Sequence, residues 1–211
     1  MSDTSERRAI YLLGDSQLLF RRERGRPLLA LLDELSADAR RRGARAVLLS
    51  ASTGDDPDQR ELFVAAMEVH GIVEVGSVPA IPSARDLERL EDADVIALSG
   101  GDVRRGWDAF VAAGLDALVA RRHAHGALLV GISAGAMQLG RLAWDERGSF
   151  DTLGLVPFVV GAHEEPRWPG LRAVLERMPS GARGLGVPLG GGAIFRADGS
   201  LTPVGKGCLE L

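Results

Sequence analysis

The chain has 211 residues, 45% of them hydrophobic, which is enough for one well-buried core in a single domain. Its formal charge is −4, and the 25 basic and 29 acidic residues are mixed along the chain, so nothing indicates a nucleic-acid partner. A single cysteine, Cys208, excludes an internal disulfide and a multi-cysteine metal site. No apolar run approaches about 18 residues, and residues 1–8 lack a signal-peptide core, so we expect no membrane partner and a cytoplasmic location.

The first half of the chain alternates apolar runs with segments of helical periodicity. We expect strands at residues 9–13, 46–50, 72–75 and 95–98. We expect helices at residues 27–42, 57–70, 83–90 and 107–123, the last with a break at Gly114. Pro27 and Pro57 suit the first turn of a helix, and Ser83 followed by Asp86 is typical of a capping arrangement. This alternation predicts a parallel sheet with helices on both faces.

Several polar features have plain structural interpretations. The charged stretch at residues 21–26 is typical of a solvated loop. His70 stands at an expected helix end, where an imidazole complements the helix dipole. His123 and His125 lie beside arginines in a polar segment, so we expect both at the surface. Cys208 is expected to be a small apolar residue near a C-terminal strand.

The stretch LLVGISAGAMQLG at residues 128–140 has the order strand, tight turn, helix. A serine in that setting, with glycines two residues before and two after it, is typical of a nucleophile elbow. The glycines at 131 and 135 remove side chains that would collide with the turn. A helix beginning at Ala134 directs free N–H groups toward Ser133, where they would stabilise negative charge. Ser133 is therefore the candidate nucleophile, and the alternative is an ordinary turn serine.

The expected strand at residues 95–98 runs directly into Ser99-Gly100-Gly101-Asp102. A glycine pair at the end of a strand lets backbone N–H groups face a ligand with no side chain between them. Asp102 has two interpretations of equal weight, a cap for the next helix or a contact to substrate.

A histidine downstream of the elbow differs from the other three. An extended stretch at residues 155–160 leads into Gly161-Ala162-His163, so His163 stands at the end of an apolar strand, where a general base would be presented. The alternative is a structural histidine. Beyond it we expect a helix near residues 171–178, a hairpin turn at residues 198–199, and short strands at residues 185–187, 193–195, 201–204 and 209–211.

Three separated motifs, LSGGD at residues 98–102, GISAGA at 131–136 and FDTLGLVPFVVGAH at 150–163, have an order and spacing that resemble peptidase family S51. That family holds aspartyl dipeptidase (peptidase E) and cyanophycinase. The resemblance covers about residues 9–210. It implies one α/β domain over residues 1–211, with a mostly parallel doubly wound sheet, helices on both faces and C-terminal antiparallel hairpin strands, similar to class I glutamine amidotransferases.

The resemblance also implies roles for individual residues. Ser133 matches the family's nucleophile and His163 matches its base. The backbone N–H groups of Gly101 and Ala134 would then form the oxyanion hole. Two arginines after the histidine, Arg167 and Arg172, fall where members of the cyanophycinase type carry arginines, and a guanidinium can hold a substrate carboxylate by two hydrogen bonds.

The chain departs from the family pattern at one position. The acid that completes a Ser-His-Glu arrangement is expected in a segment that here reads Gly186-Val187-Pro188-Leu189, and leucine cannot orient an imidazole. Loss of the orienting carboxylate lowers kcat about ten-thousandfold in the serine-protease template. The candidates for a replacement acid are Asp145 and Glu146, with Asp151 and Glu164 also close in sequence, and a backbone carbonyl is a further alternative.

These observations favour a serine peptidase that hydrolyses an amide bond in small aspartyl or β-aspartyl peptides, requires no metal or cofactor, and is compatible with a homodimer. Two alternatives belong to other functional classes. Leu189 motivates a catalytically weak or inactive relative that binds an acidic metabolite or a partner protein. A general esterase would use the same elbow without any need for Arg167.

Overall fold

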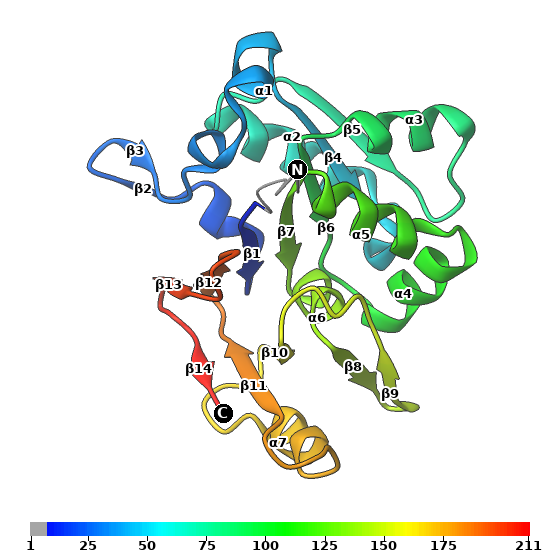
Figure 1. Ribbon diagram of the computed structural model, residues 1–211, viewed down its shortest axis with the longest axis vertical. Coiled ribbons are helices and arrows are strands. Elements are labelled where there is room, and N and C mark those ends of the chain that lie inside the picture. Colours follow the sequence, from blue (N-terminus) through cyan, green and yellow to red (C-terminus); the bar gives the residue numbers. More distant parts are fainter. Residues whose placement is uncertain (1–7) are drawn as a thin grey trace, which may run out of the picture.

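The computed structural model describes residues 8–211. Of the N-terminal segment searched for a signal-peptide core, residues 1–7 therefore lie outside the described part of the chain. Within these residues seven strands form the central sheet, in the order β13 (Leu201–Gly205), β12 (Gly191–Phe195), β1 (Ile10–Leu13), β7 (Leu128–Ile132), β6 (Val95–Leu98), β4 (Arg45–Leu49) and β5 (Glu74–Val78). The five strands β1, β7, β6, β4 and β5 are parallel, and β12 and β13 extend the sheet beyond β1 as antiparallel strands (Figure 1). The predicted fold class is confirmed.

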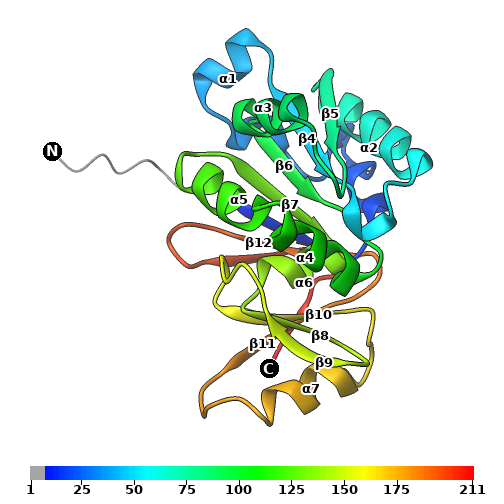
Figure 2. The same ribbon diagram turned by 90° about the vertical axis from the view of Figure 1, so that its right-hand side faces the viewer.

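Helices cover both faces of this sheet (Figure 2). One face, called here the α4 face, packs against α3 (Ala84–Asp92), α4 (Val103–Ala112), α5 (Leu115–Ala124) and α6 (Ala134–Leu139). The other, called the α2 face, packs against α2 (Pro57–Val69) and α1 (Ala37–Arg42). Alternate residues of β1 divide between the two cores, with Leu12 on the α4 face and Leu13 on the α2 face. Burial on both faces explains why the strands are continuously apolar.

The register of the sheet brings three loops to one edge. Leu13 of β1 pairs with Ile132 of β7, and Leu98 of β6 pairs with Gly131. The residues that follow these strands, among them Ser99 and Ser133, therefore leave the sheet together. In open α/β sheets ligands bind outside the carboxyl ends of the strands, so this edge is where a site is expected.

A second, smaller sheet packs beside the first. It contains β10 (Phe158–Ala162), β11 (Arg183–Val187) and β14 (Leu209–Glu210), with α7 (Pro169–Leu175) against it. Its own core is built around Trp168 and Leu171, whereas Phe158 and Val160 of β10 belong to the α4-face core. The segments expected as strands at residues 185–187 and 209–211 thus lie in this second sheet. A hairpin of β8 (Leu142–Asp145) and β9 (Gly148–Asp151) precedes it.

The long helix expected over residues 27–42 is wrong. Pro27 lies in a two-stranded hairpin, β2 (Arg22–Glu23) and β3 (Arg26–Pro27), within the charged stretch expected as a solvated loop. A 3₁₀ turn, η2 (Leu31–Glu34), follows, and only then α1 (Ala37–Arg42). The cause is a cap: the Ser36 hydroxyl accepts a hydrogen bond from the Ala39 N–H (3.1 Å), which starts a new helix after extended Leu35. The helix-like spacing of the leucines in this region therefore reflects the 3₁₀ turn and not one long α-helix.

Other helix boundaries follow the predictions more closely. Asp56 caps α2 at Pro57, Ser83 and Asp86 form a capping box, and left-handed Gly114 separates α4 from α5. The strand expected at residues 72–75 is β5, two to three residues later. The reason is that Ile72 closes the end of α2, with its N–H donating to the Met67 carbonyl.

Two histidine predictions need correction. His123 is buried rather than exposed, and its Nδ1 lies 3.0 Å from the Ala127 carbonyl oxygen. His70 does end α2, but its ring is buried with Nε2 2.9 Å from the Leu19 carbonyl oxygen. Burial lowers the pKa of His70, which disfavours a cation facing the helix dipole. His125 is exposed, as predicted.

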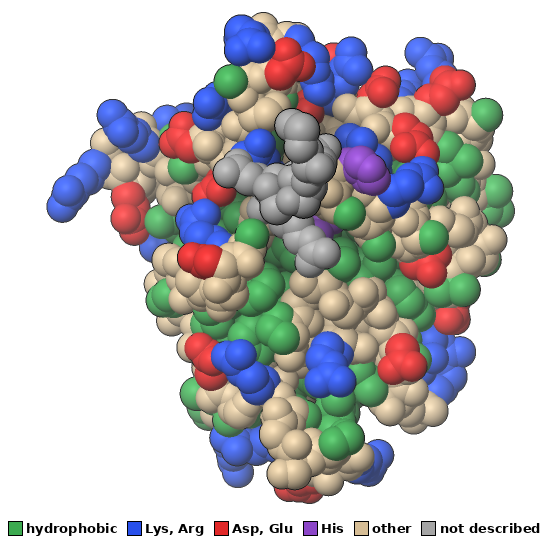
Figure 3. Space-filling view, in the orientation of Figure 1, with side chains coloured by type: hydrophobic (Ala, Val, Ile, Leu, Met, Phe, Trp, Pro, Cys, Tyr) green, Lys and Arg blue, Asp and Glu red, His purple; other side chains and the backbone are tan. Residues whose placement is uncertain are grey.

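The surface carries charges of both signs. On the face shown in Figure 3, basic and acidic side chains are interspersed, and no extended area of one sign is visible. This arrangement agrees with the mixed charges along the sequence. Among residues 8–211, no helix combines the length and the apolar character needed to cross a membrane.

Candidate active site

Ser133 occupies a strained turn between β7 and α6. Its backbone angles are φ 51° and ψ −109°, outside the regions that a serine usually adopts, and its N–H donates to the Leu13 carbonyl (2.8 Å). Both flanking glycines are required by space: a Cβ on Gly131 would lie 2.7 Å from the backbone of Ala136, and one on Gly135 would lie 2.1 Å from the Leu98 carbonyl oxygen. The turn therefore has the geometry predicted for a nucleophile elbow.

His163 meets Ser133 from the second sheet. It follows β10, and a 2.9 Å hydrogen bond joins its Nε2 to Ser133 Oγ. His163 also has a positive φ, 62°, and its N–H donates to the Val187 carbonyl of β11 (3.2 Å). The parallel pairing of β10 with β11 thus determines where the imidazole stands. This distance allows the imidazole to accept the serine proton directly.

Two backbone N–H groups were expected from the sequence to bind an oxyanion, those of Ala134 and Gly101. Ala134 is the first residue of α6, so its N–H has no partner within the helix. Gly101 has φ 112°, and a Cβ there would lie 2.3 Å from the Ser52 carbonyl oxygen, so only glycine fits. Its N–H donates to no acceptor in the part of the chain that the structure describes. Donors of this kind can bind an oxyanion.

Asp102 acts as a helix cap in this structure. Its carboxylate accepts a hydrogen bond from the Arg105 N–H (2.9 Å) at the start of α4. The arrangement accounts for an aspartate at this position without a substrate contact.

The two arginines that follow His163 are exposed, Arg167 on the loop that leads into α7 and Arg172 within α7 itself. Arg172 donates from Nε to the Arg167 carbonyl (3.0 Å), so the two residues are coupled. Two residues hold the loop in place. Trp168 is buried, and the Glu164 carboxylate accepts a hydrogen bond from the Leu171 N–H (2.9 Å). No ion pair engages either guanidinium within residues 8–211.

None of the acids proposed from the sequence is joined to His163. Asp145 accepts two hydrogen bonds from the Arg104 guanidinium (3.0 Å each), and this pairing holds the pKa of the carboxyl far below its usual range. Glu146 is exposed at the tip of the β8–β9 hairpin, and Glu164 is used by α7. Among the described residues, Ser133 is the single hydrogen-bond partner of the His163 ring.

Leu189, at the position expected for the family acid, is exposed, and its N–H donates to Glu165 Oε1 (3.0 Å). Sequence reasoning did not single out this carboxylate. A signal was present, because Glu165 stands two residues after His163, and the pairing of β10 with β11 brings the two following loops together. The carboxylate of Glu165 therefore contacts the loop that carries Leu189, where an acid of that loop was expected.

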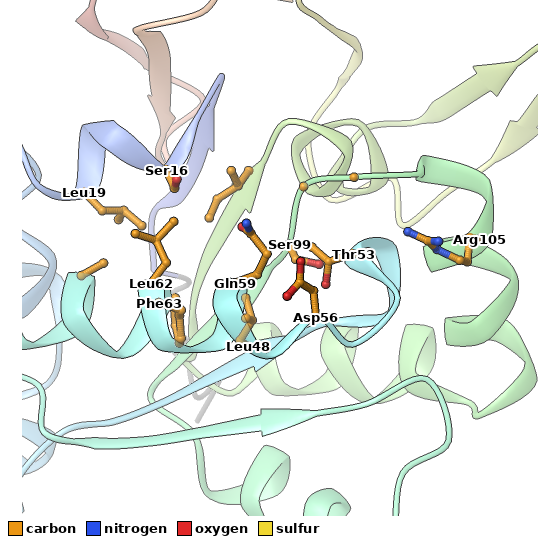
Figure 4. Close-up of a pocket in the computed structure, with 14 residues that line it drawn as sticks. Ser16, Leu19, Leu48, Thr53, Asp56, Gln59, Leu62, Phe63, Ser99 and Arg105 are labelled. Carbon is orange, nitrogen blue, oxygen red and sulfur yellow. The ribbon is translucent and has the colours of Figure 1, made fainter.

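A cavity of about 340 Å³ opens beside Ser133, on the α2 face of the sheet (Figure 4). Its apolar lining comes from scattered positions on η1 (Ser16–Leu19), β4, α2 and β7: Leu19, Leu48, Leu62, Phe63, Ala66 and Ile132. Gly100 and Gly101 also line it, and a Cβ on Gly100 would lie 3.5 Å from the Cβ of Ser133. The sequence did not indicate this cavity, because no local pattern unites four separate elements.

Comparison with known proteins identifies the family of the chain and structures with a similar fold. The model of peptidase family S51 matches residues 27–190. A peptidase from an acI-B1 actinobacterium has a similar structure, with a TM-score of 0.68 and 17% identity over 96% of this chain and 89% of the other. A putative peptidase E protein from Listeria monocytogenes EGD-e is similar too, with a TM-score of 0.66 and 17% identity over 94% of this chain and 98% of the other. No curated protein matches the sequence. The family match spans most of the chain, which therefore belongs to peptidase family S51.

Proposed function

We propose that this peptidase is of the serine type and that it hydrolyses an amide bond in small peptides bearing an aspartyl or β-aspartyl group. The observation that carries the proposal is the 2.9 Å hydrogen bond between His163 Nε2 and the hydroxyl of Ser133, which stands on a strained turn. A hydroxyl in this position is accessible to a carbonyl carbon, and the adjacent imidazole can remove its proton.

The reaction would proceed in two stages. His163 Nε2 takes the proton as Ser133 Oγ attacks the carbonyl carbon, and the N–H groups of Gly101 and Ala134 stabilise the negative oxygen that forms. When the carbon–nitrogen bond breaks, the imidazolium returns the proton to the leaving amine. Water, deprotonated by the same imidazole, then attacks the acyl ester and releases the acid and free Ser133.

Arg167 and Arg172 support the preference for an acidic substrate. Arg167 is exposed on the loop that begins at His163 and Arg172 is exposed on α7, and no carboxylate of residues 8–211 pairs with either. A guanidinium without a carboxylate partner in the protein can hold the carboxylate of a substrate by two parallel hydrogen bonds. We assign these arginines to substrate binding near the leaving amine.

The test is hydrolysis of dipeptides that carry an aspartyl or β-aspartyl residue, in the first position and in the second, by the protein and by its Ser133→Ala variant. The proposal expects turnover by the protein and a loss of at least about a thousandfold in the variant. Equal turnover by both would exclude Ser133 as the nucleophile.

One observation favours a second function. His163 has no carboxylate partner among the described residues, and Leu189 stands where the family acid is expected. This arrangement suits a relative of low activity that binds an acidic metabolite or a partner protein. A fluorophosphonate probe separates the two functions, because only an activated serine is labelled at Ser133.

A further inference from the structure

Gln138 is a fully buried polar side chain on α6, the helix that follows the candidate nucleophile Ser133. Its Nε2 donates two hydrogen bonds, one to the hydroxyl of Ser52 on η3 (Ala51–Thr53) at 3.2 Å and one to the Val103 carbonyl at 3.0 Å. A carbonyl oxygen can only accept, so the contact with Val103 determines which end of the amide faces it. One side chain thus joins three segments that are far apart in the sequence.

Both partners of this amide hold residues 99–102, called here the oxyanion loop. The Ser52 carbonyl accepts a hydrogen bond from the Asp102 N–H (2.9 Å). The same carbonyl lies so close to Gly101 that a Cβ there would be 2.3 Å from its oxygen. Val103 begins α4 directly after the loop. The amide therefore contacts the residue on which Gly101 packs and the residue at which the loop ends.

The oxyanion loop packs closely against the elbow. A Cβ on Gly100 would lie 3.5 Å from the Cβ of Ser133. A Cβ on Gly135, in α6, would lie 2.1 Å from the carbonyl oxygen of Leu98, the residue before the loop. α4 and α6 are also neighbours on the same face of the sheet (Figure 2). A shift of the loop away from α6 would therefore move Gly101 relative to the serine.

Stability alone does not explain a buried amide at this position. The Oε1 of Gln138 has no hydrogen-bond partner among the described residues. A buried acceptor without a partner carries a desolvation cost that an apolar side chain of similar size would avoid. The surroundings leave little room for movement, since a Cβ on Gly106 would lie 1.9 Å from Ser52 Oγ and 2.7 Å from Gln138 Nε2. The two donated hydrogen bonds thus hold their partners in one arrangement.

We propose that Gln138 is a positioning residue that holds the oxyanion loop against α6, so that the Gly101 N–H stays where it stabilises the oxyanion. The inference rests on the proposed function, because a fixed donor matters only if negative charge forms beside Ser133. Gln138 acts through Ser52 and Val103 and needs no contact with substrate. An oxyanion donor acts mainly on the transition state, so its displacement should lower kcat and leave KM nearly unchanged.

The first test is Gln138→Met, which removes both donated hydrogen bonds and keeps a side chain of similar length. We expect kcat for an aspartyl dipeptide to fall at least about tenfold while KM stays within about twofold, because small displacements of catalytic groups cost up to about a hundredfold in rate. Leu139→Met is the matched control, since it places the same side chain at the next, equally buried position of α6. Unchanged kcat in Gln138→Met, an equal loss in Leu139→Met, or a loss expressed in KM would overturn the proposal.

Ser52→Ala tests the same contact from its other side and keeps the proposal testable if Gln138→Met does not fold. It removes the hydroxyl that Gln138 binds and leaves the carbonyl that accepts from Asp102. We expect kcat to fall at least about twofold with KM nearly unchanged, the effect of one neutral hydrogen bond. Where both single variants fold, the double variant should be no slower than Gln138→Met, because the two substitutions break one contact. Losses that multiply would contradict this.

The outcome also separates this inference from the proposed function. If the unchanged protein neither hydrolyses aspartyl dipeptides nor is labelled by a fluorophosphonate at Ser133, the proposed function itself fails. If the unchanged protein is active and both Gln138→Met and Ser52→Ala keep its kcat, the role assigned to Gln138 is wrong and the serine mechanism stands.

Discussion

His163 Nε2 and Ser133 Oγ are joined across two different sheets, at the end of β10 and the end of β7. Each residue is held by a backbone hydrogen bond to a neighbouring strand, Ser133 to Leu13 and His163 to Val187. The pair therefore depends on how the small sheet packs on the large one. If the two side chains act as one unit, their removal should not be additive.

We accordingly predict the outcome of a double substitution. Ser133→Ala and His163→Ala should each lower kcat for a dipeptide by roughly 10³-fold or more, and the double variant should be no slower than the slower single variant. Steady-state kinetics with all three variants checks this. Losses that multiply would show that the two residues contribute independently, contrary to a shared proton transfer.

A second prediction concerns the position without an acid. Leu189 is 51% exposed, and the loop that carries it follows β11, the direct neighbour of β10. A carboxylate introduced there can orient the imidazole through Nδ1, so we expect Leu189→Glu to raise kcat by about tenfold or more, within the roughly 10⁴-fold effect of such a carboxylate in serine proteases. Leu189→Gln is the control without charge. An equal gain from glutamine, or no gain from glutamate, would show that Nδ1 needs no acid from this loop.

Much of this architecture could be predicted from the sequence because it depends on local patterns. Continuously apolar runs mark the strands buried on both faces, and the glycines around Ser133 mark a turn with no room for side chains. The order of serine and histidine, each at the end of an apolar strand, indicated that the two would meet, and the structure places them within hydrogen-bond distance.

The features that the sequence did not reveal depend on contacts between distant segments. His123 looks exposed beside its arginines, but the turn to Ala127 buries it. The Glu165–Leu189 contact requires the parallel pairing of β10 with β11, which no pattern within either segment specifies. Asp145 was a candidate acid because of its place between serine and histidine, and only the fold shows that Arg104 occupies it.

The Asp145–Arg104 pair should make stability depend on acid pH. Hydrogen bonds from Arg104 lower the pKa of Asp145 below its ordinary value of 3.8, so the folded protein favours the ionised form. A depressed carboxyl pKa contributes stability that is present above the unfolded value and is lost as the pH falls toward the folded value. We predict that Asp145→Asn lowers the melting temperature at neutral pH and that its difference from the unchanged protein shrinks below about pH 4.

The same variant tests whether Asp145 takes part in catalysis. If its role is only to hold the β8–β9 hairpin to α4 through Arg104, Asp145→Asn should keep fluorophosphonate labelling of Ser133 within about twofold of the unchanged protein. Loss of labelling in a variant that remains folded at neutral pH would assign the carboxylate to the catalytic group instead.

Ser99 and Ser50 are two buried serines that follow adjacent strands of the sheet, and they should respond differently to replacement by alanine. The Ser50 hydroxyl donates to Asp55 (2.7 Å), so Ser50→Ala should destabilise the protein by about 1 kcal/mol. The Ser99 hydroxyl has no hydrogen-bond partner within residues 8–211, so Ser99→Ala should leave the melting temperature unchanged or raise it.

If the Ser99 hydroxyl bonds a bound substrate, the same substitution should lower kcat/KM for an aspartyl dipeptide about 2- to 12-fold, the loss of one neutral hydrogen bond worth about 0.5–1.5 kcal/mol. Thermal denaturation and peptide hydrolysis measured on both variants separate the effects, because only a contact with substrate lowers activity without lowering stability. Unchanged kcat/KM in Ser99→Ala would mean that the hydroxyl does not touch the substrate.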